Sequence, residues 1–257
     1  MADSTHANLT RRDLTHTGRR RKSYTAEMTR SQAEKLLTGL PKVGGASRRA
    51  QYSASTKRAL IEVATTQFSE HGYGGTSLDA IVAGARVTKG ALYHHFSGKQ
   101  GVFEAVFSKV EDDASKTIKA ALRGSNDPWE KARAGLRAFL TVVQEPTYQR
   151  IVIQDGPAIL GYERFREQEE RSSFGIVQDI VGSVLEASTY ELDEAMKQTF
   201  SRIFFGAMSA AGESVTTAED PGQAVARIEA AILFILEGFR ALAEQGVVIT
   251  DPALDQG

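Results

Sequence analysis

Several features are missing from this sequence of 257 residues, and each absence argues against a class of protein. The sequence has no cysteine, which excludes disulfide bonds and thiolate metal sites and agrees with a reducing compartment. No apolar stretch approaches the roughly 20 residues that cross a bilayer, so we expect no membrane association. The N-terminus is polar and rich in arginine and lacks the apolar core of a secretory signal. Together these absences predict a cytoplasmic protein.

Sequence signatures of enzymes are missing as well. No HExxH zinc motif, GxSxG elbow, Walker glycine loop or dinucleotide fingerprint occurs. The five histidines show no metal-ligand spacing, and adjacent His94 and His95 point to different faces of a helix. The carboxylates of Asp112, Asp113 and the 167–170 stretch lie on charged helices, which is typical of a solvated face. We therefore expect no catalytic residue, no metal and no cofactor.

The net charge of −1 hides an asymmetry along the chain. Residues 1–58 hold 13 Lys and Arg against 4 Asp and Glu, whereas the remainder holds 18 against 28. A basic arm on an acidic body suits a protein that touches a polyanion with one end. A solvated tail whose charge only maintains solubility remains an alternative.

The remaining sequence has helical periodicity, without the alternation of strands and without internal repeats. From Ser55 to His71 the apolar residues Leu60, Ala64 and Phe68 recur every four positions, and Gly72 can end that helix. Residues 1–47 hold few large apolar side chains, so we expect disorder there, with a short amphipathic helix possible over residues 25–40. The predicted fold class is all-α.

The stretch from Thr76 to Phe107 predicts two short helices and the start of a third. Thr76, Thr88 and Ser97 are each placed to cap the N-terminus of one of these helices. Two short helices joined by a turn of three or four residues form a helix-turn-helix, whose second helix enters the major groove of DNA. Hydrogen-bond donors beside its N-terminus are what phosphate oxygens require.

Residues 56–107 resemble the tetracycline-repressor (TetR) family of transcription regulators. The resemblance rests on Phe68, His71-Gly-Tyr73, Thr76, Ile81, Val87-Thr-Lys-Gly-Ala-Leu-Tyr-His-His-Phe96 and Lys99. It implies a three-helix DNA-binding domain followed by a helical ligand-binding and dimerisation domain. The expected DNA-binding residues are Thr76, Arg86, Thr88, Lys89, Gly90, Tyr93, His94 and Lys99, with Arg48 and Arg49 reaching a groove or the backbone.

The chain departs from the family pattern in the turn of the hairpin. Arg86 stands where such proteins usually carry glycine, and a positive φ there costs a non-glycine residue roughly 1 kcal/mol. Alternatively, the turn has a different geometry and leaves the guanidinium free to meet a phosphate. Gly84, two residues before Arg86, lowers the helix propensity of the helix that precedes the turn.

We predict four regions: a basic, disordered arm over residues 1–54, the helix-turn-helix domain over 55–104, the ligand-binding and dimerisation domain over 105–246, and a tail over 247–257. Within the third region, Asp127 and Pro128 begin one helix, a long helix covers residues 162–187, and Ser188 with Glu191 forms a capping box for the next. The last helix carries an apolar run over residues 230–236, which must be buried all round and therefore predicts a homodimer.

An apolar cavity is expected where Asp155-Gly-Pro157 and Gly161 interrupt the helices, because irregular backbone packs imperfectly. The inner faces of four helices carry surplus large apolar residues, for each of which plain core is the alternative. The candidate wall residues are Trp129, Phe139, Val143, Ile159, Phe165, Phe174, Phe204 and Met208. No Lys, Arg or Glu is assigned to this face, so the predicted ligand is mainly apolar.

These observations predict a homodimeric, ligand-responsive regulator, and specifically a repressor. Its partners are double-stranded operator DNA and a small, mainly apolar effector, whose binding releases the DNA. A helical small-molecule-binding or scaffolding protein without sequence-specific DNA binding is the alternative. A general nucleoid protein that binds unrelated DNA equally well is a third possibility.

Overall fold

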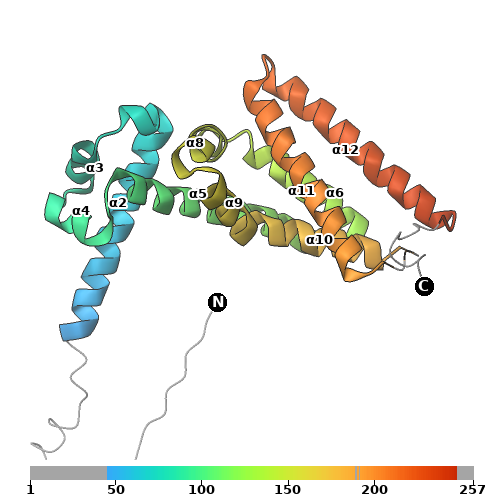
Figure 1. Ribbon diagram of the computed structural model, residues 1–257, viewed down its shortest axis with the longest axis horizontal. Helices are drawn as coiled ribbons and strands as arrows, with labels where there is room; N and C mark the ends of the chain where they lie inside the picture. Colours follow the sequence, from blue (N-terminus) through green and yellow to red (C-terminus); the bar gives the residue numbers. More distant parts are fainter. Residues whose placement is uncertain (1–44, 189, 191, 248–257) are drawn as a thin grey trace, which may run out of the picture. The chain divides into compact units, whose positions relative to one another are not determined.

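The computed structural model describes residues 45–188, 190 and 192–247, and every regular element within these ranges is a helix (Figure 1). The predicted all-α fold is therefore confirmed. The expected disorder of residues 1–44, the short helix over residues 25–40 and most of the C-terminal tail lie outside the described residues. None of the described helices is long and apolar enough to cross a membrane.

The first described helix, α2 (Gly45–Gly75), begins before the predicted start at Ser55. No proline or glycine interrupts residues 46–54, so nothing in that stretch ends the helix, and the prediction of disorder up to residue 54 is wrong for them. The predicted core positions Leu60, Ala64 and Phe68 are fully buried. Gly72 departs from helical geometry, with φ 68°, as its place near the helix end led us to expect.

Helices α3 (Leu78–Ala85) and α4 (Lys89–His95) form the predicted hairpin, and their N-caps are partly those expected. Thr88 caps α4, with its hydroxyl accepting from the Ala91 N–H at 3.2 Å. Ser77, and not Thr76, caps α3, accepting from the Ala80 N–H at 3.1 Å. Thr76 is instead buried, and its hydroxyl donates back to α2 at the Gly72 carbonyl, 2.8 Å away.

The third predicted cap is also wrong. Helix α5 (Lys99–Ala121) follows Gly98, whose φ is 143°, and no side chain caps it. Gly98 leaves Ser97 outside the capping position, because the chain makes its turn one residue later than expected.

The turn of the hairpin takes the strained form considered above. Arg86 adopts the left-handed conformation (φ 54°, ψ 41°), and its N–H bonds to the Ala83 carbonyl at 3.1 Å. Gly84 has a packing role, because a Cβ there would lie 2.7 Å from a Val63 methyl on α2. The absence of a side chain thus allows α3 to approach α2 closely.

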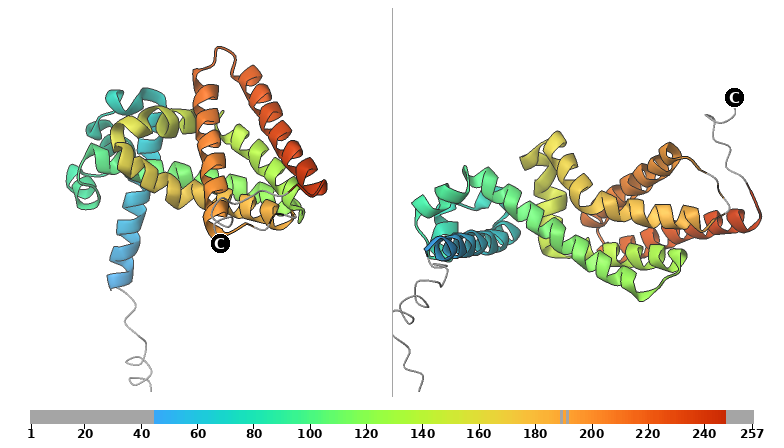
Figure 2. Two further views of the ribbon diagram at one scale, coloured as in Figure 1. Left: turned by 45° about the vertical axis from the view of Figure 1, so that its right-hand side comes forward. Right: turned by 90° about the horizontal axis from the view of Figure 1, so that it is seen from below.

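The remaining chain is a set of packed helices, with π-helical segments labelled η2 and η3. In chain order they are η1 (Leu122–Gly124), α6 (Pro128–Val142), α7 (Pro146–Tyr148), η2 (Gln149–Asp155), α8 (Gly156–Leu160), α9 (Tyr162–Glu169), η3 (Glu170–Phe174), α10 (Gly175–Glu186), α11 (Glu194–Thr217) and α12 (Pro221–Glu244). Helix α10 lies beside α6 and α11 (Figure 2). The predicted long helix over residues 162–187 is present, but contains the π-helical stretch η3.

Aspartates cap several of these helices. Asp127 accepts from the Trp129 N–H at 2.7 Å and begins α6 with Pro128, as predicted. Helix α11 begins after Asp193, which accepts from the Met196 N–H at 2.7 Å, so the predicted start at Ser188 is wrong. The Ser188 hydroxyl instead donates to the Leu185 carbonyl at the end of α10.

One buried cluster runs from the helix-turn-helix into the following helices, and α5 is common to both parts. On one side, Phe103 of α5 packs edge-on against Phe68 and Tyr73, with ring centroids 5.3 Å apart in each pair. One turn further along α5, Phe107 meets Phe165 of α9 at 5.7 Å. Helix α5 therefore packs against both the helix-turn-helix and the helices that follow it, within one continuous core.

The apolar run over residues 230–236 of α12 is not buried all round in this chain. Phe234 is 80% exposed and Ile235 is 53% exposed, while Ile232 and Leu233 pack against the core. Within the described residues no helix of the same chain covers the outward face of α12, so burial of this run by a second copy stays a prediction.

We predict that Gly84→Ala destabilises the protein by about 1–3 kcal/mol, because the added methyl group meets Val63 between α3 and α2. Gly182→Ala on α10 is the matched control, since nothing lies within 4 Å of a Cβ there. It should stabilise by about 0.5–1 kcal/mol through helix propensity. Urea denaturation measures both, and equal effects of the two substitutions would contradict the close packing of α3 on α2.

Candidate DNA-binding surface and ligand cavity

Helix α4 buries one face and exposes the other. Leu92, within the helix, and Phe96, just after it, are buried in the core. The opposite face presents the predicted DNA-binding residues that lie on α4 or at its N-cap, and Tyr93 among them is 59% exposed. The exposed positions are Thr88, Lys89, Gly90, Tyr93 and His94. This is the arrangement that a recognition helix requires, since the buried face fixes the helix and leaves the other free for base edges and phosphates.

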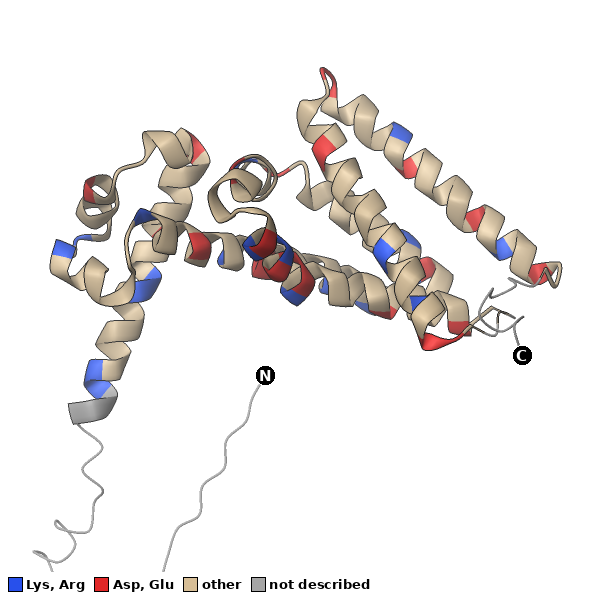
Figure 3. Cartoon of the chain, viewed as in Figure 1, with Lys and Arg blue, Asp and Glu red and all other residues tan. Residues whose placement is uncertain are grey.

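The charged side chains around α4 are mostly basic, but one of them, Lys89, already forms an ion pair within the chain. The ammonium of Lys89 lies 2.7 Å from Oδ1 of Asp79 on α3, and its pKa is raised by that hydrogen bond. Both side chains are exposed, so the contact is weak and a phosphate oxygen can replace the carboxylate. Figure 3 shows Lys and Arg at the start of α4 and along the first half of α2.

The other predicted contacts lie around this helix. Lys99, the first residue of α5, places its ammonium 4.4 Å from the centroid of the Tyr73 ring. Arg86 is exposed in the turn between α3 and α4. Arg48 and Arg49 are exposed on α2. Thr76 cannot serve as predicted, because it is buried and its hydroxyl is engaged with backbone carbonyls of α2.

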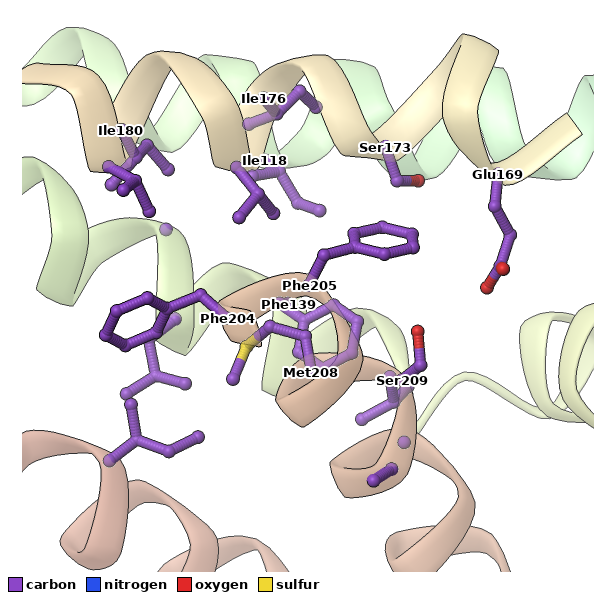
Figure 4. Close-up of a pocket in the computed structure, with 18 of the residues that line it drawn as sticks. Ile118, Phe139, Glu169, Ser173, Ile176, Ile180, Phe204, Phe205, Met208 and Ser209 are labelled. Carbon is purple, nitrogen blue, oxygen red and sulfur yellow. The ribbon is translucent and has the colours of Figure 1, made fainter. Parts of the chain in front are cut away.

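A cavity of about 560 Å³ lies among α5, α6, η2 and α9 to α12 (Figure 4). Five of the eight predicted wall residues line it, namely Phe139, Val143, Phe165, Phe204 and Met208. Its volume is within the usual range for sites that bind small molecules. The five residues that were predicted correctly all belong to the apolar part of the wall.

Three predicted wall residues lie elsewhere. Phe174 stands behind the wall, packed edge-on against Phe205 at 5.5 Å and covered by the Arg202 guanidinium. Ile159 packs against the core, and its carbonyl accepts from the Gln100 side chain. Trp129 lies in the first turn of α6, before the wall begins at Ala132.

The cavity also has a polar end, which contradicts the expectation that no glutamate faces it. Glu111 of α5 is 2% exposed and accepts hydrogen bonds from three hydroxyl groups. The donors are Tyr148 at 2.9 Å, Ser172 at 2.5 Å and Ser173 at 2.8 Å. A buried carboxylate is tolerated when such donors replace its hydration. In return, burial and the neighbouring Glu111 raise the pKa of the Tyr148 hydroxyl well above its ordinary value.

Glu169 is the second carboxylate at this end, and it was wrongly assigned to a solvated face. Figure 4 shows its side chain directed into the cavity toward Ser209. Burial, and then the negative charge of Glu111, raise its pKa to about 7, whereas Arg166 and the Ser209 hydroxyl act in the opposite direction. A spacing signal was available, since Phe165, Glu169, Ser173, Ile176 and Ile180 recur every three or four residues.

The segment η2 faces both the cavity and the helix-turn-helix. Val152 and Ile153 line the cavity. On its other side, the Asp155 carboxylate accepts from the Tyr73 N–H at 2.8 Å and lies 3.4 Å from the Arg150 guanidinium. That guanidinium covers Gly72 so closely that a Cβ there would lie 1.8 Å from it. Sequence reasoning missed this contact, because the two segments are far apart in the chain.

This fold and these two sites define a helix-turn-helix protein with a helical, cavity-containing second part. Comparison with known families agrees. A family described as "Bacterial regulatory proteins, tetR family" matches residues 60–106, and "Tetracyclin repressor-like, C-terminal domain" matches residues 129–239. The chain belongs to the TetR family, whose members are transcription regulators.

Individual relatives support the same assignment. The Transposon Tn10 TetC protein of Escherichia coli is 29% identical over 51% of this chain and 66% of its own length. The probable acrEF/envCD operon repressor of Escherichia coli is 26% identical over 49% of this chain and 56% of its own. The chain thus spans between half and two thirds of these curated relatives. A TetR-family regulator from Pectobacterium atrosepticum has a crystal structure with a TM-score of 0.64 and 29% identity, covering 73% of this chain and 95% of that one.

We predict that Lys99→Ala weakens DNA binding similarly for all sequences and lowers the slope of log K against log salt by about one unit. The reason is that a lysine at the start of α5, beside the recognition helix, is placed to neutralise one phosphate. Lys119→Ala, exposed near the other end of α5, is the control and should change neither quantity. Fluorescence anisotropy across a salt series measures both, and an unchanged slope in Lys99→Ala would contradict this placement of the surface.

A second prediction concerns Glu169 and pH. Because its pKa is about 7 in the folded chain and about 4.5 when unfolded, its burial costs stability increasingly as pH rises from about 4.5 to 7. Glu169→Gln should therefore match the wild type near pH 4.5 and exceed it by roughly 1–3 kcal/mol at pH 8. Denaturation at several pH values tests this. Glu167→Gln, exposed on the same helix, should show no such dependence, and a flat difference for Glu169→Gln would show that the carboxylate is solvated.

Proposed function

We propose that the protein is a dimeric transcription regulator, a repressor that leaves its operator DNA when a small molecule occupies the cavity. The observation that carries this proposal is η2, which lines the cavity with Val152 and Ile153 and contacts the helix-turn-helix through Asp155. An occupied cavity that displaces η2 must also act on the end of α2. The proposal places the protein in the cytoplasm, with the DNA.

On DNA, α4 lies in the major groove. Thr88, Lys89, Tyr93 and His94 on its exposed face contact base edges and phosphates, and Lys99 contacts a phosphate beside them. Packing within the chain does not require glycine at position 90, since the nearest atom to a Cβ there would be 3.9 Å away. The missing side chain instead lets DNA approach the backbone closely. Arg48 and Arg49 on α2 contact the backbone or the adjacent groove.

Dimerisation uses the outward faces of α11 and α12. These carry the exposed apolar residues Ile203 (62%), Phe234 (80%) and Leu242 (45%), among small residues such as Ala230 and Gly238. Small residues let helices approach closely, and large exposed apolar side chains need a cover. Pairing of these helices with the same helices of a second copy buries the run over residues 230–236. It also provides the two recognition helices that paired half-sites require, about 34 Å apart.

The proposal is tested by DNA binding in the presence of compounds that stabilise the protein. A thermal-shift screen finds compounds that occupy the cavity, and anisotropy with the DNA upstream of the protein's own coding sequence then measures release. The proposal requires sequence-specific binding that stabilising compounds weaken. Absence of any DNA binding at low salt would favour the helical ligand-binding or scaffolding protein, and equal affinity for unrelated DNA would indicate a nucleoid protein.

The dimer makes its own prediction. Phe234→Glu should convert the dimer to monomer, because two charges would be buried at the interface without partners, and operator affinity should fall at least tenfold. Tyr162→Glu, which replaces another exposed aromatic residue (74%) on α9, is the control and should stay dimeric. Analytical ultracentrifugation measures the state of both. A wild-type monomer, or a dimeric Phe234→Glu, would contradict the assigned interface.

Coupling between the cavity and the DNA should depend on Asp155. Asp155→Ala removes the acceptor for the Tyr73 N–H, so it should reduce the ratio of operator affinities without and with a cavity-binding compound, which is typically 5- to 150-fold in coupled systems. Asp155→Asn keeps an acceptor oxygen and should retain most of the ratio. Binding of the compound itself, measured by calorimetry, should persist in both variants. An undiminished ratio in Asp155→Ala would show that coupling takes another route.

A further inference from the structure

The two carboxylates at the polar end of the cavity indicate the chemistry of the effector. Resting on the proposed function, we propose that the effector is an amphipathic cation, with a positively charged nitrogen held at Glu169 and an apolar body in the rest of the cavity.

The charges in the wall are all of one sign. The charged side chains that line the cavity are Glu111, Glu169 and Glu213, and no Lys, Arg or His is among the described residues of the wall. Glu213 is exposed, whereas Glu111 is buried and Glu169 is half-buried, so both are at least partly withdrawn from water. An anionic ligand would meet uncompensated repulsion here, whereas a cation would supply the opposite charge that the site lacks.

Of the two withdrawn carboxylates, Glu169 is the one available to a ligand. Both oxygens of Glu111 already accept hydrogen bonds, from Tyr148 on one side and from Ser172 and Ser173 on the other. Glu169 faces a single hydroxyl, that of Ser209 on α11.

Among the residues that the structure describes, the Glu169 carboxylate forms no ion pair. Glu111 on α5 and Glu170 on its own helical run both disfavour its ionisation. Arg166 favours it, but the Arg166 guanidinium is committed to Glu170 at 3.2 Å and to the Tyr162 hydroxyl at 3.2 Å. A cationic nitrogen in the cavity would therefore be the nearest free positive charge.

The rest of the cavity suits an apolar body attached to that nitrogen. In Figure 4 the Phe205 ring lies between the polar end and the apolar end, where Phe204, Ile176 and Ile180 gather. Aromatic rings accept cations over their faces as well as apolar groups, so the Phe205 ring beside the polar end suits both the cationic nitrogen and the apolar body. The volume of about 560 Å³ accommodates a molecule of several rings or a long alkyl chain.

The test uses matched probes that differ in charge alone. One series consists of aryl and alkyl trimethylammonium ions with bodies of increasing size, and the other consists of their neutral tert-butyl isosteres. Calorimetry on the full-length protein at pH 8 should give the cations at least tenfold higher affinity, the preference expected from one pKa unit of differential interaction. Equal affinity within each pair would overturn the inference.

The pH dependence provides a readout that a merely apolar cavity would lack. A permanent cation requires ionised Glu169, so its affinity should rise by up to tenfold per pH unit below about 7 and level off above it. Near pH 7 its binding should release roughly half a proton, detectable as a buffer-dependent enthalpy. The neutral isosteres should show neither effect, and a flat profile for the cations would contradict the role of Glu169.

Glu169→Gln keeps the shape of the side chain and removes its charge. It should abolish the preference for the cation, the pH dependence and the proton release, and leave the affinity of the neutral isostere within about twofold. Glu167→Gln, exposed on the same helix, should retain all three. Should Glu169→Gln fail to fold, the wild-type probe pairs and pH profile still decide the question.

DNA release separates this inference from the proposed function. Cations that bind preferentially and also release DNA support both. Neutral isosteres that bind as well as the cations and release DNA would leave the proposed function standing and overturn the inference. Probes that bind the cavity without affecting DNA would contradict the proposed function, whichever probe binds better. Binding of neither series would count against the cavity as an effector site, and therefore against both.

Discussion

The hydrogen bond from the Tyr73 N–H to the Asp155 carboxylate joins two regions of the chain that have separate tasks. Tyr73 follows the non-helical Gly72 near the end of α2, and Asp155 ends the π-helical segment that lines the cavity. π-helical turns are rare in proteins and occur frequently at functional sites. Because Phe103 and Phe107 of α5 hold the same two regions in one core, a movement at Asp155 would be transmitted to a packed helix-turn-helix.

The cavity shows how a polar site is maintained inside an apolar core. Glu111 accepts hydrogen bonds from three hydroxyl groups and forms no ion pair with any residue in the described part of the chain, so its oxygens are already engaged within the wall. Glu169 differs, because its raised pKa of about 7 lets its charge change within the neutral pH range. Under the inference above, the negative charge of ionised Glu169 costs stability in the free protein, and a ligand of opposite charge would relieve that cost.

Sequence reasoning succeeded where local patterns decide the structure. The four-residue spacing of Leu60, Ala64 and Phe68 predicted the core face of α2, and Thr88 predicted the start of α4. It failed where tertiary contacts decide the structure. The Thr76 hydroxyl donates to a backbone carbonyl of α2 and does not cap α3, and Gly84 is explained by close packing against Val63. The polar residues of the cavity were missed because a glutamate on a charged helix resembles a solvated one until its facing helices are known. The Asp155 contact joins segments too distant in sequence for any local pattern to reveal.

The most direct test of this account is hydrogen exchange at the Tyr73 amide, measured by NMR on the dimer with and without a compound that occupies the cavity and releases DNA. The account predicts that the exchange rate of this amide changes when the compound binds, because its acceptor Asp155 lies on the segment that the compound contacts. The change should be absent in Asp155→Ala, in which the amide has already lost its partner. Release of DNA with an unaltered exchange rate at Tyr73 in the wild type would contradict the central claim.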